Sequence, residues 1–264
     1  MVLATQGAWN AAYELDGFSN WEMLPLDDLT EFLSATQINW SRIKTIVDLG
    51  CGRGLRDFIL LLKNPELNRS EVTLMGIDFS QKAIETARQF HASLDSGGSR
   101  PNTLAQALRS VGLPDERLAL YAQTHFECKD ILSADLEGRI AVPTFDLVID
   151  WMCFHEIPFD RHQEYIERIA EICAKFLVLN VFSRHGSSLE FLPPAVQDVD
   201  KHQFSDSEIA KSFAPYFEIL KMKSYPEDLH PIPTPTDKVV AAKKAYLMTR
   251  TQSQPKRVVN VNRQ

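Results

Sequence analysis

The chain has 264 residues, 44% hydrophobic and 24% charged, with a formal net charge of −7, which suits one folded domain with a sizeable core. The acidic balance disfavours a nucleic-acid partner, whose phosphates Lys and Arg would bind, and the longest apolar run, residues 176–182, is too short to cross a bilayer. The four cysteines show neither zinc-site pairing nor disulfide-scaffold density, and no signal-peptide pattern begins the chain, so we expect a cytoplasmic protein without metal.

The N-terminal region is predicted to be helical over residues 8–35, with a helix start at Pro25. Four aromatic side chains lie unusually close together there: Trp9, Tyr13, Phe18 and Trp21. They exceed what one short helix needs for packing. We therefore expect residues 1–40 to form a helical lid segment with Trp21 over a bound ligand. The alternative is that Trp21 only staples this helix to the core.

Short apolar runs then alternate with helical patterns along the rest of the chain. Strands are expected at residues 45–49, 72–77, 121–128, 145–149, 176–182, 217–222 and 245–249. Helices are expected at residues 55–62, 81–91, 104–110 and 161–173, and from Ser205, which forms a capping box with Glu208. This alternation predicts an α/β fold with a mainly parallel sheet, closed at one edge by a hairpin of the last two strands.

Two segments fall outside this alternation. Residues 95–119 make an unusually long connection, with turn-forming residues at 96–102. Residues 251–264 are polar and carry Lys256, Arg257 and Arg263, and we expect a disordered tail there. The remaining domain then covers residues 41–250.

A glycine-rich motif follows the first predicted strand. It reads Asp48-x-Gly50-x-Gly52-x-Gly54, and glycines at such a turn let the backbone approach a ligand closely. A nicotinamide-binding fingerprint would place its third glycine at position 55, where this chain has Leu55. The acidic residue before the glycines also suits a cationic ligand better than a pyrophosphate.

Acidic residues also end the next two predicted strands. Asp78 comes 24 residues after Gly54, and its carboxylate can accept hydrogen bonds from two ribose hydroxyls, worth about 1.5–3 kcal/mol each. The alternative is that Asp78 caps the following helix, although Ser80 already offers a cap. Asp130 can accept from an adenine amino group, with Ile131 packed on the ring.

These motifs together resemble those of class I S-adenosylmethionine-dependent methyltransferases. The resemblance is closest to their small-molecule branch, which includes the thiopurine, thiol and tellurite-resistance enzymes. It is carried by residues 46–54, 76–80, 145–150 and 154–158, and by the aromatic N-terminal segment. It implies a Rossmann-like, doubly wound sheet of seven strands, mainly parallel, with the last strand antiparallel. It also implies S-adenosylmethionine as the methyl donor, S-adenosylhomocysteine as its product, and no metal.

The resemblance also implies where the cofactor would lie. The methionine part would face Asp48, Gly50, Cys51 and Gly52, the ribose Asp78, the adenine Phe79, Asp130 and Ile131, and the sulfonium end Asp150, with Trp21 above. Many relatives have a glycine soon after the residue that matches Asp150, where this chain has Trp151-Met152. That departure and the long connection lie near the expected pocket, so they leave the acceptor open.

Methyl transfer requires that donor and acceptor be aligned and water excluded. A hydroxyl or amine acceptor needs a base more than a thiol does, and the candidates are Asp150, His155 and Glu156. His155 and Glu156 could instead only support the loop before Pro158. They do not form a zinc-protease motif, because Phe159 occupies the position of the second histidine.

We therefore expect a small-molecule methyltransferase acting on a thiol, hydroxyl or amine, either monomeric or homodimeric. Three alternatives remain at this point. The basic tail is compatible with a protein or RNA acceptor. A non-catalytic module could retain the fold. A nicotinamide oxidoreductase is disfavoured by the glycine spacing.

Overall fold

The central sheet sets the position of every candidate residue. The computed structural model describes residues 6–14, 26–95, 101–113, 119–133, 144–183, 203–233 and 238–251. Trp21 and tail residues 252–264 lie outside these ranges. Within them, seven strands form one sheet in the order β3-β2-β1-β4-β5-β7-β6. The strands are β1 (Thr45–Leu49), β2 (Thr73–Asp78), β3 (Gln123–Cys128), β4 (Phe145–Trp151), β5 (Cys173–Ser183), β6 (Phe217–Pro233) and β7 (Lys238–Arg250).

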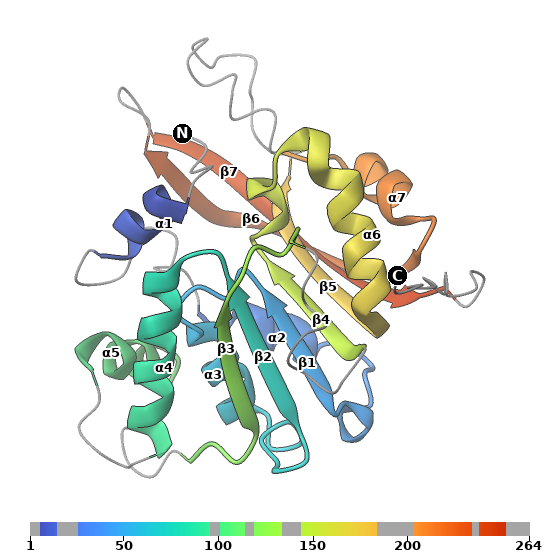
Figure 1. Cartoon of the computed structure of the whole chain (residues 1–264). Coiled ribbons are helices and arrows are strands. Elements are labelled where there is room, and N and C mark those ends of the chain that lie inside the picture. The colour runs from blue at the N-terminus through green and yellow to red at the C-terminus, as the bar shows by residue number, and fades with distance from the viewer. Residues whose placement is uncertain are drawn as a thin grey trace, which may run out of the picture.

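The strand pairing confirms the predicted fold class. Strands β1 to β5 pair with one another in parallel, and β7 is antiparallel to both β5 and β6. The hairpin of β6 and β7 is much longer than expected (Figure 1). Antiparallel neighbours satisfy each other's backbone hydrogen bonds, so pairing continues past the apolar positions that mark a strand in sequence.

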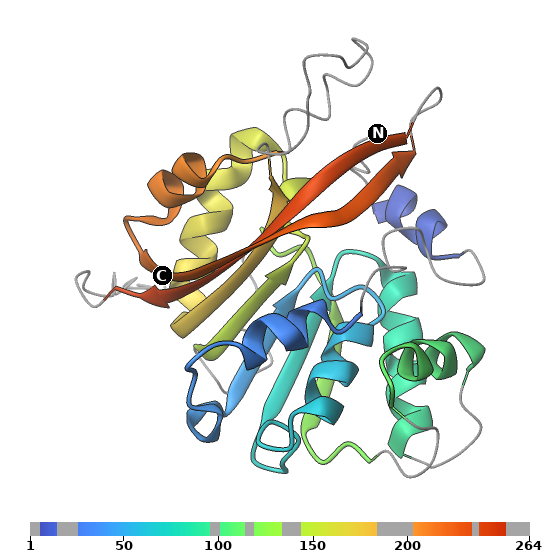
Figure 2. The ribbon, with the colours of Figure 1, turned by 180° about the vertical axis from the view of Figure 1, so that it is seen from behind.

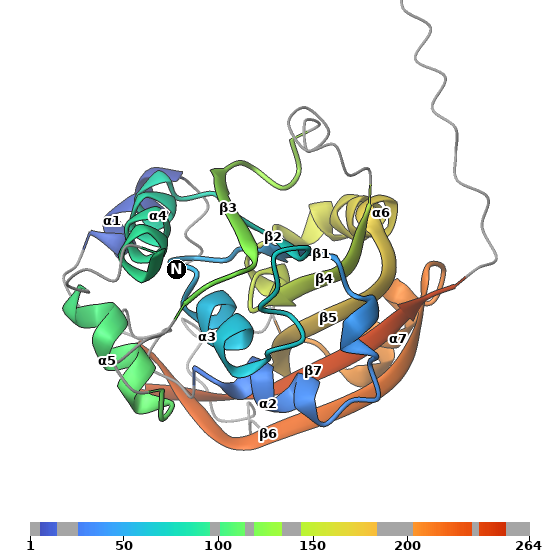
Figure 3. The ribbon, with the colours of Figure 1, turned by 90° about the horizontal axis from the view of Figure 1, so that it is seen from below.

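Helices cover both faces of the sheet. They are α1 (Gln6–Tyr13), α2 (Asp28–Ser34), α3 (Leu55–Lys63), α4 (Gln81–Asp95), α5 (Asn102–Ser110), α6 (His162–Ile172) and α7 (Asp206–Phe213). Figure 3 shows α6 on one side of the sheet and α2 and α3 on the other, while α4 and α5 flank the β3 edge. Figure 2 shows the same arrangement from behind. No helix in the described ranges is both long and apolar enough to span a membrane.

The helical prediction for residues 8–35 corresponds to two helices among the described residues, α1 and α2. The helix start expected at Pro25 matches α2, which begins at Asp28. Leu29, Phe32 and Leu33 of α2 are fully buried against the sheet, so α2 belongs to the core. Only α1 remains as described structure for the proposed lid.

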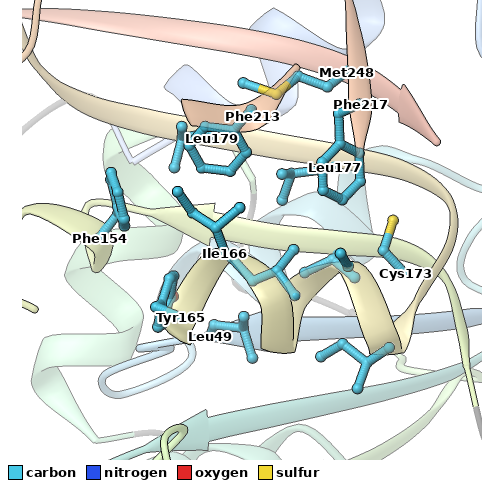
Figure 4. Close-up of a cluster of buried hydrophobic side chains, with 14 of the residues drawn as sticks. Leu49, Phe154, Tyr165, Ile166, Cys173, Leu177, Leu179, Phe213, Phe217 and Met248 are labelled. Atoms are coloured by element: carbon cyan, nitrogen blue, oxygen red, sulfur yellow. The ribbon is translucent and has the colours of Figure 1, made fainter. Parts of the chain in front are cut away.

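The largest core lies under α6. Tyr165, Ile166 and Ile169 of α6 and Phe213 of α7 belong to this cluster, part of which is drawn in Figure 4. All four side chains are at most 1% exposed, and each contributes about 1.5–3 kcal/mol by leaving water. This core fixes the carboxyl ends of β4 and β5, where the predicted catalytic residues lie.

Helix starts are set by local chemistry that the sequence indicates correctly. Ser205 accepts from the Glu208 amide and forms the predicted capping box at α7. Ser80 Oγ accepts from the Ala83 amide at 3.2 Å at the start of α4. Helix α4 continues to Asp95, beyond the expected end at residue 91.

Candidate functional site

The glycine-rich loop joins β1 to α3 at the carboxyl edge of the sheet. Gly50 and Gly52 have φ angles of 75° and 56°, a left-handed conformation that glycine adopts readily. A Cβ added at Gly50 would lie 2.7 Å from Cβ of Cys153, so only glycine lets the segment after β4 approach this closely. The backbone amides of Gly50 and Cys51 donate to the Ile77 carbonyl at 2.7 and 3.0 Å. The half-buried Cys51 is thus held where the loop meets β2.

Asp78 ties this loop to the end of β2. Its carboxylate accepts from the Gly52 amide at 2.8 Å and from the Ser80 amide at 2.7 Å. The structure therefore brings Asp78 and the glycine loop together, as the sequence predicts.

Helix α1 lies over the turn between β2 and α4 (Figures 1 and 2). Asn10 Oδ1 accepts from Ser80 Oγ at 2.9 Å and from the Lys82 amide at 3.3 Å. Gln6 donates to the carbonyl of Phe79 at 3.0 Å. Sequence reasoning missed both anchors, because a polar residue on a short helix carries no signal of a partner about 70 residues away.

Tyr13, at the end of α1, reaches the glycine loop itself. Its hydroxyl would lie 2.7 Å from a Cβ placed on Gly52. The Arg53 guanidinium donates to the Tyr13 carbonyl at 3.2 Å and lies 5.5 Å from the centre of its ring. The aromatic cluster in the N-terminal sequence was the correct signal for this contact.

The end of β3 completes the β2 side of the site. The Lys129 amide donates to the Asp78 carbonyl at 3.0 Å, which places the predicted adenine residues beside β2. Asp130 accepts from the Leu132 amide at 2.9 Å, and Ile131 is buried. Phe79 is among the exposed large apolar side chains.

Asp48 contacts a second buried carboxyl group that sequence reasoning missed. Asp57, in the first turn of α3, is fully buried, and its carboxyl group is within hydrogen-bonding reach of that of Asp48. No group in the described ranges donates to Asp48 Oδ1 or to either oxygen of Asp57. Burial, followed by the charge of Asp57, raises the pKa of Asp48 well above its usual range. The available signal was a single Asp inside a largely apolar helix.

Asp150, at the end of β4, has a different environment. Its carboxylate accepts from the Tyr165 hydroxyl at 2.7 Å and from the amides of Cys153 and Phe154 at 2.9 and 3.0 Å. Burial raises its pKa to about 6, although these hydrogen bonds oppose the shift. Asp150 therefore holds the segment that follows β4 in place. Cys153 of that segment packs against Gly50.

Met152 has a backbone conformation that glycine adopts more readily. Its φ angle is 76°, in the left-handed region that costs a side chain roughly 1–2 kcal/mol. Its amide donates to the carbonyl of Asn180 on β5 at 3.0 Å. That bond helps to hold the strained backbone, which redirects the chain toward His155.

His155, after β4, and Asn180, on the neighbouring β5, each have buried polar atoms. His155 Nε2 lies 3.2 Å from Glu156 Oε1, and its ring packs edge-on against Phe182 at 4.5 Å between centroids. Asn180 is two residues before Phe182 on β5, so both side chains point to the same face of the sheet. Neither His155 Nδ1 nor either amide atom of Asn180 has a hydrogen-bond partner in the described part of the chain.

Asn180 was not identified from the sequence as a functional residue. The only signal was that it interrupts the otherwise apolar run of residues 176–182. Polar groups buried without partners are uncommon in folded proteins, and they concentrate at sites that bind a ligand or water.

Among the described residues, no three or more His, Cys, Asp and Glu side chains are grouped so that they could hold a metal ion.

Comparison with known proteins establishes the fold. No protein-family model matches the chain, and no curated protein matches its sequence. Magnesium protoporphyrin IX methyltransferase of Synechocystis PCC 6803, with bound S-adenosylhomocysteine, is 15% identical over 93% of this chain and 99% of that one, with a TM-score of 0.53. The 1,6-didemethyltoxoflavin-N1-methyltransferase of Burkholderia thailandensis is 15% identical over 93% and 87%, with a TM-score of 0.54.

A third solved structure extends the likeness to nearly the whole chain. It is the complex between the Haloferax volcanii Trm112 methyltransferase activator and its proposed methyltransferase partner, 14% identical over 97% of this chain and 100% of that one, with a TM-score of 0.59. The chain therefore has the fold of class I S-adenosylmethionine-dependent methyltransferases, as the sequence resemblance predicts.

Proposed function

We propose that the protein is an S-adenosylmethionine-dependent methyltransferase that acts on a small molecule. One observation carries the proposal. A glycine loop in left-handed conformation lies between the buried carboxyl of Asp48 and the carboxylate of Asp78, at the carboxyl edge of a sheet of methyltransferase type. Ligands of open α/β sheets bind at this edge.

The residues present fit the cofactor. Asp48 is a buried carboxyl group directly before the glycine loop, and its Oδ1 has no donor within the described ranges, so the positive charge of an amino group bound on the loop would compensate its negative charge. Asp78 lies beside the glycine loop at the end of β2, where its carboxylate could accept from ribose hydroxyls, and Phe79 offers an exposed ring for an adenine. When bound, S-adenosylmethionine would supply an electrophilic methyl group. The loop, Asp78 and α1 would orient it and exclude water.

On the acceptor side, the proposal assigns proton removal to His155. If Nε2–H donates to Glu156, Nδ1 has a free lone pair and can accept the proton of an acceptor hydroxyl or amine. Glu156 would then select the tautomer, and Asn180 would bind a polar group of the acceptor through its unpaired amide. Asp150 acts indirectly, because its three hydrogen bonds hold the segment that carries His155.

A small acceptor is supported by the solved structures of this fold. One of them acts on magnesium protoporphyrin IX, and another is described with bound 1,6-didemethyltoxoflavin. The net charge of −7 makes a polyanionic acceptor less favourable. Met152 bonds the backbone of Asn180 and Phe182 packs against His155, and both apolar side chains are half-buried, which suits a partly apolar acceptor.

Calorimetric titration with S-adenosylmethionine and S-adenosylhomocysteine, with NAD as the control ligand, tests the proposal. We expect micromolar binding of the first two and none of NAD. Transfer of a labelled methyl group to a panel of thiols, phenols and amines then identifies the acceptor class. Absence of binding by both adenosyl ligands to folded protein would overturn the proposed function.

A further inference from the structure

We propose that Asp48 and Asp57 share one proton before the cofactor binds, and that a cationic group on the glycine loop displaces it. Asp57 would then be a positioning residue that makes cofactor binding depend on pH. This inference rests on the proposed function, and it concerns a residue outside the glycine loop itself. It follows from the geometry of three adjoining segments: the end of β1, the glycine loop and the first turn of α3.

The two carboxyl groups form a contact that water does not reach. Asp48 is 4% exposed and Asp57 is fully buried. Each lies within hydrogen-bonding reach of the other. Since no donor in the described ranges reaches Asp57 or Oδ1 of Asp48, hydrogen bonds from the protein do not neutralise the pair.

Two carboxylates in such contact cannot both be ionised at low cost. Their mutual repulsion and their desolvation both favour the neutral form of one group. A proton held between them turns the repulsion into a hydrogen bond. Consistent with this, burial raises the pKa of both groups.

The other charges around the pair leave it negative. Arg56 is the neighbouring cation, but its Nε already bonds Asp28 Oδ1 at 3.1 Å. Asp150, at the end of β4, adds a further negative charge toward Asp48. The Cys51 thiol faces the same carboxylates, and burial raises its pKa, so it stays neutral. This environment favours a bound cation over further ionisation of the pair.

Cofactor binding would therefore be coupled to the release of a proton. The α-amino group of S-adenosylmethionine carries a positive charge and would approach the carboxyl group of Asp48 from the glycine loop. Its field stabilises the doubly ionised pair, and the displaced proton passes to the buffer. For one linked proton, affinity rises up to about ten-fold per pH unit until the pair ionises by itself.

Calorimetry in buffers of different ionisation enthalpy measures that proton directly. At pH 6.5 we expect the heat of S-adenosylmethionine binding to vary linearly with buffer ionisation enthalpy, with a slope approaching one proton released. 5′-Methylthioadenosine, which lacks the amino acid part, should bind with a slope near zero. A near-zero slope for S-adenosylmethionine, or equal slopes for both ligands, overturns the inference.

The variant Asp57→Asn tests whether the released proton comes from this pair or from another titrating group. An amide donates to Asp48 permanently, so we expect binding without proton release and with an affinity that changes less than two-fold between pH 6 and 8. Glu66→Gln, an exposed acid beyond α3, is the matched control and should keep the wild-type slope. Unchanged proton release in Asp57→Asn contradicts the assignment.

The outcomes distinguish this inference from the proposed function. If the wild-type protein binds no S-adenosylmethionine in any buffer, both fail. If it binds without proton release, only the shared proton is disproved. The wild-type titrations decide this point even if the variant does not fold.

Discussion

At the residue scale, aspartates at the ends of two adjacent strands have opposite environments. Asp150 is satisfied by three donors, whereas Asp48 Oδ1 has none among the described residues. Hydrogen bonds to a buried charge stabilise a structure, and a buried acceptor without a donor is costly. Asp150, whose carboxylate has three donors, therefore stabilises the backbone of the site, and Asp48 is left to interact with a ligand.

Asp78→Ala should weaken S-adenosylmethionine binding by about ten-fold to a hundred-fold. The substitution removes the ribose acceptor, worth one or two hydrogen bonds to a charged group, and releases the Gly52 amide. Calorimetric Kd values provide the measurement, and Asp160→Ala, an exposed change, is the control. Wild-type affinity in folded Asp78→Ala protein would show that Asp78 does not bind the cofactor.

Asn180→Leu should raise the free energy of unfolding by about 1–3 kcal/mol. The change replaces a fully buried amide, unpartnered in the described ranges, with an apolar side chain of similar size. The same variant should bind S-adenosylmethionine normally but transfer methyl groups at least ten-fold more slowly. Urea unfolding and the labelled-methyl assay measure the two effects. Reduced stability with unimpaired transfer would contradict a binding role for the amide.

At the element scale, side-chain contacts anchor α1 in the part of the chain that the structure describes. Asn10 and Gln6 connect it to the turn between β2 and α4, and Tyr13 rests on the glycine loop. Elements with few buried apolar contacts open at low free-energy cost. We therefore propose α1 as the part of the N-terminal segment that opens and closes over the cofactor.

Asn10→Ala should release α1 with little effect on the core. Loss of two hydrogen bonds, each about 0.5–1.5 kcal/mol, should speed amide exchange in residues 6–13 several-fold and weaken cofactor binding by up to about ten-fold. Hydrogen exchange and calorimetry measure these effects, with Glu14→Ala, just after α1, as the control. Unchanged exchange in α1 would show that Asn10 is not an anchor.

At the scale of the whole molecule, buried acids make stability depend on pH. Burial raises the pKa of Asp57 to about 7 and that of Asp150 to about 6, against about 3.9 in an unfolded chain. A carboxyl whose folded pKa is raised favours the folded state most fully below its unfolded pKa. That contribution is lost as the pH rises through the folded pKa, here between about pH 4 and 7.

Asp57→Asn should therefore gain stability relative to wild type as the pH rises from 5 to 8. The expected change in the difference is on the order of 2–4 kcal/mol, because the amide does not titrate. Thermal or urea unfolding at both pH values measures it, and Glu66→Gln again serves as the control. A difference that is independent of pH would show that Asp57 is ionised throughout.

The sequence by itself determined the fold class and the positions of most strands. Period-two and period-3.6 patterns are local, as are the left-handed glycines and the capping residues Ser80 and Ser205. The acidic residues at strand ends followed from the same patterns, because parallel strands place their carboxyl ends at one edge. The hairpin of the last two strands was predicted, but both strands are longer than expected, because cross-strand pairing is not a local pattern.

The tertiary structure alone decided which of these residues meet. Asp57 contacts Asp48 only because α3 packs back against β1. Asn180 lies on the same face of β5 as Phe182, the ring against which His155 packs. Whether a buried carboxylate is satisfied or unsatisfied depends on donors from distant segments, such as Tyr165 for Asp150. Such contacts join residues far apart in the chain, so no local pattern encodes them.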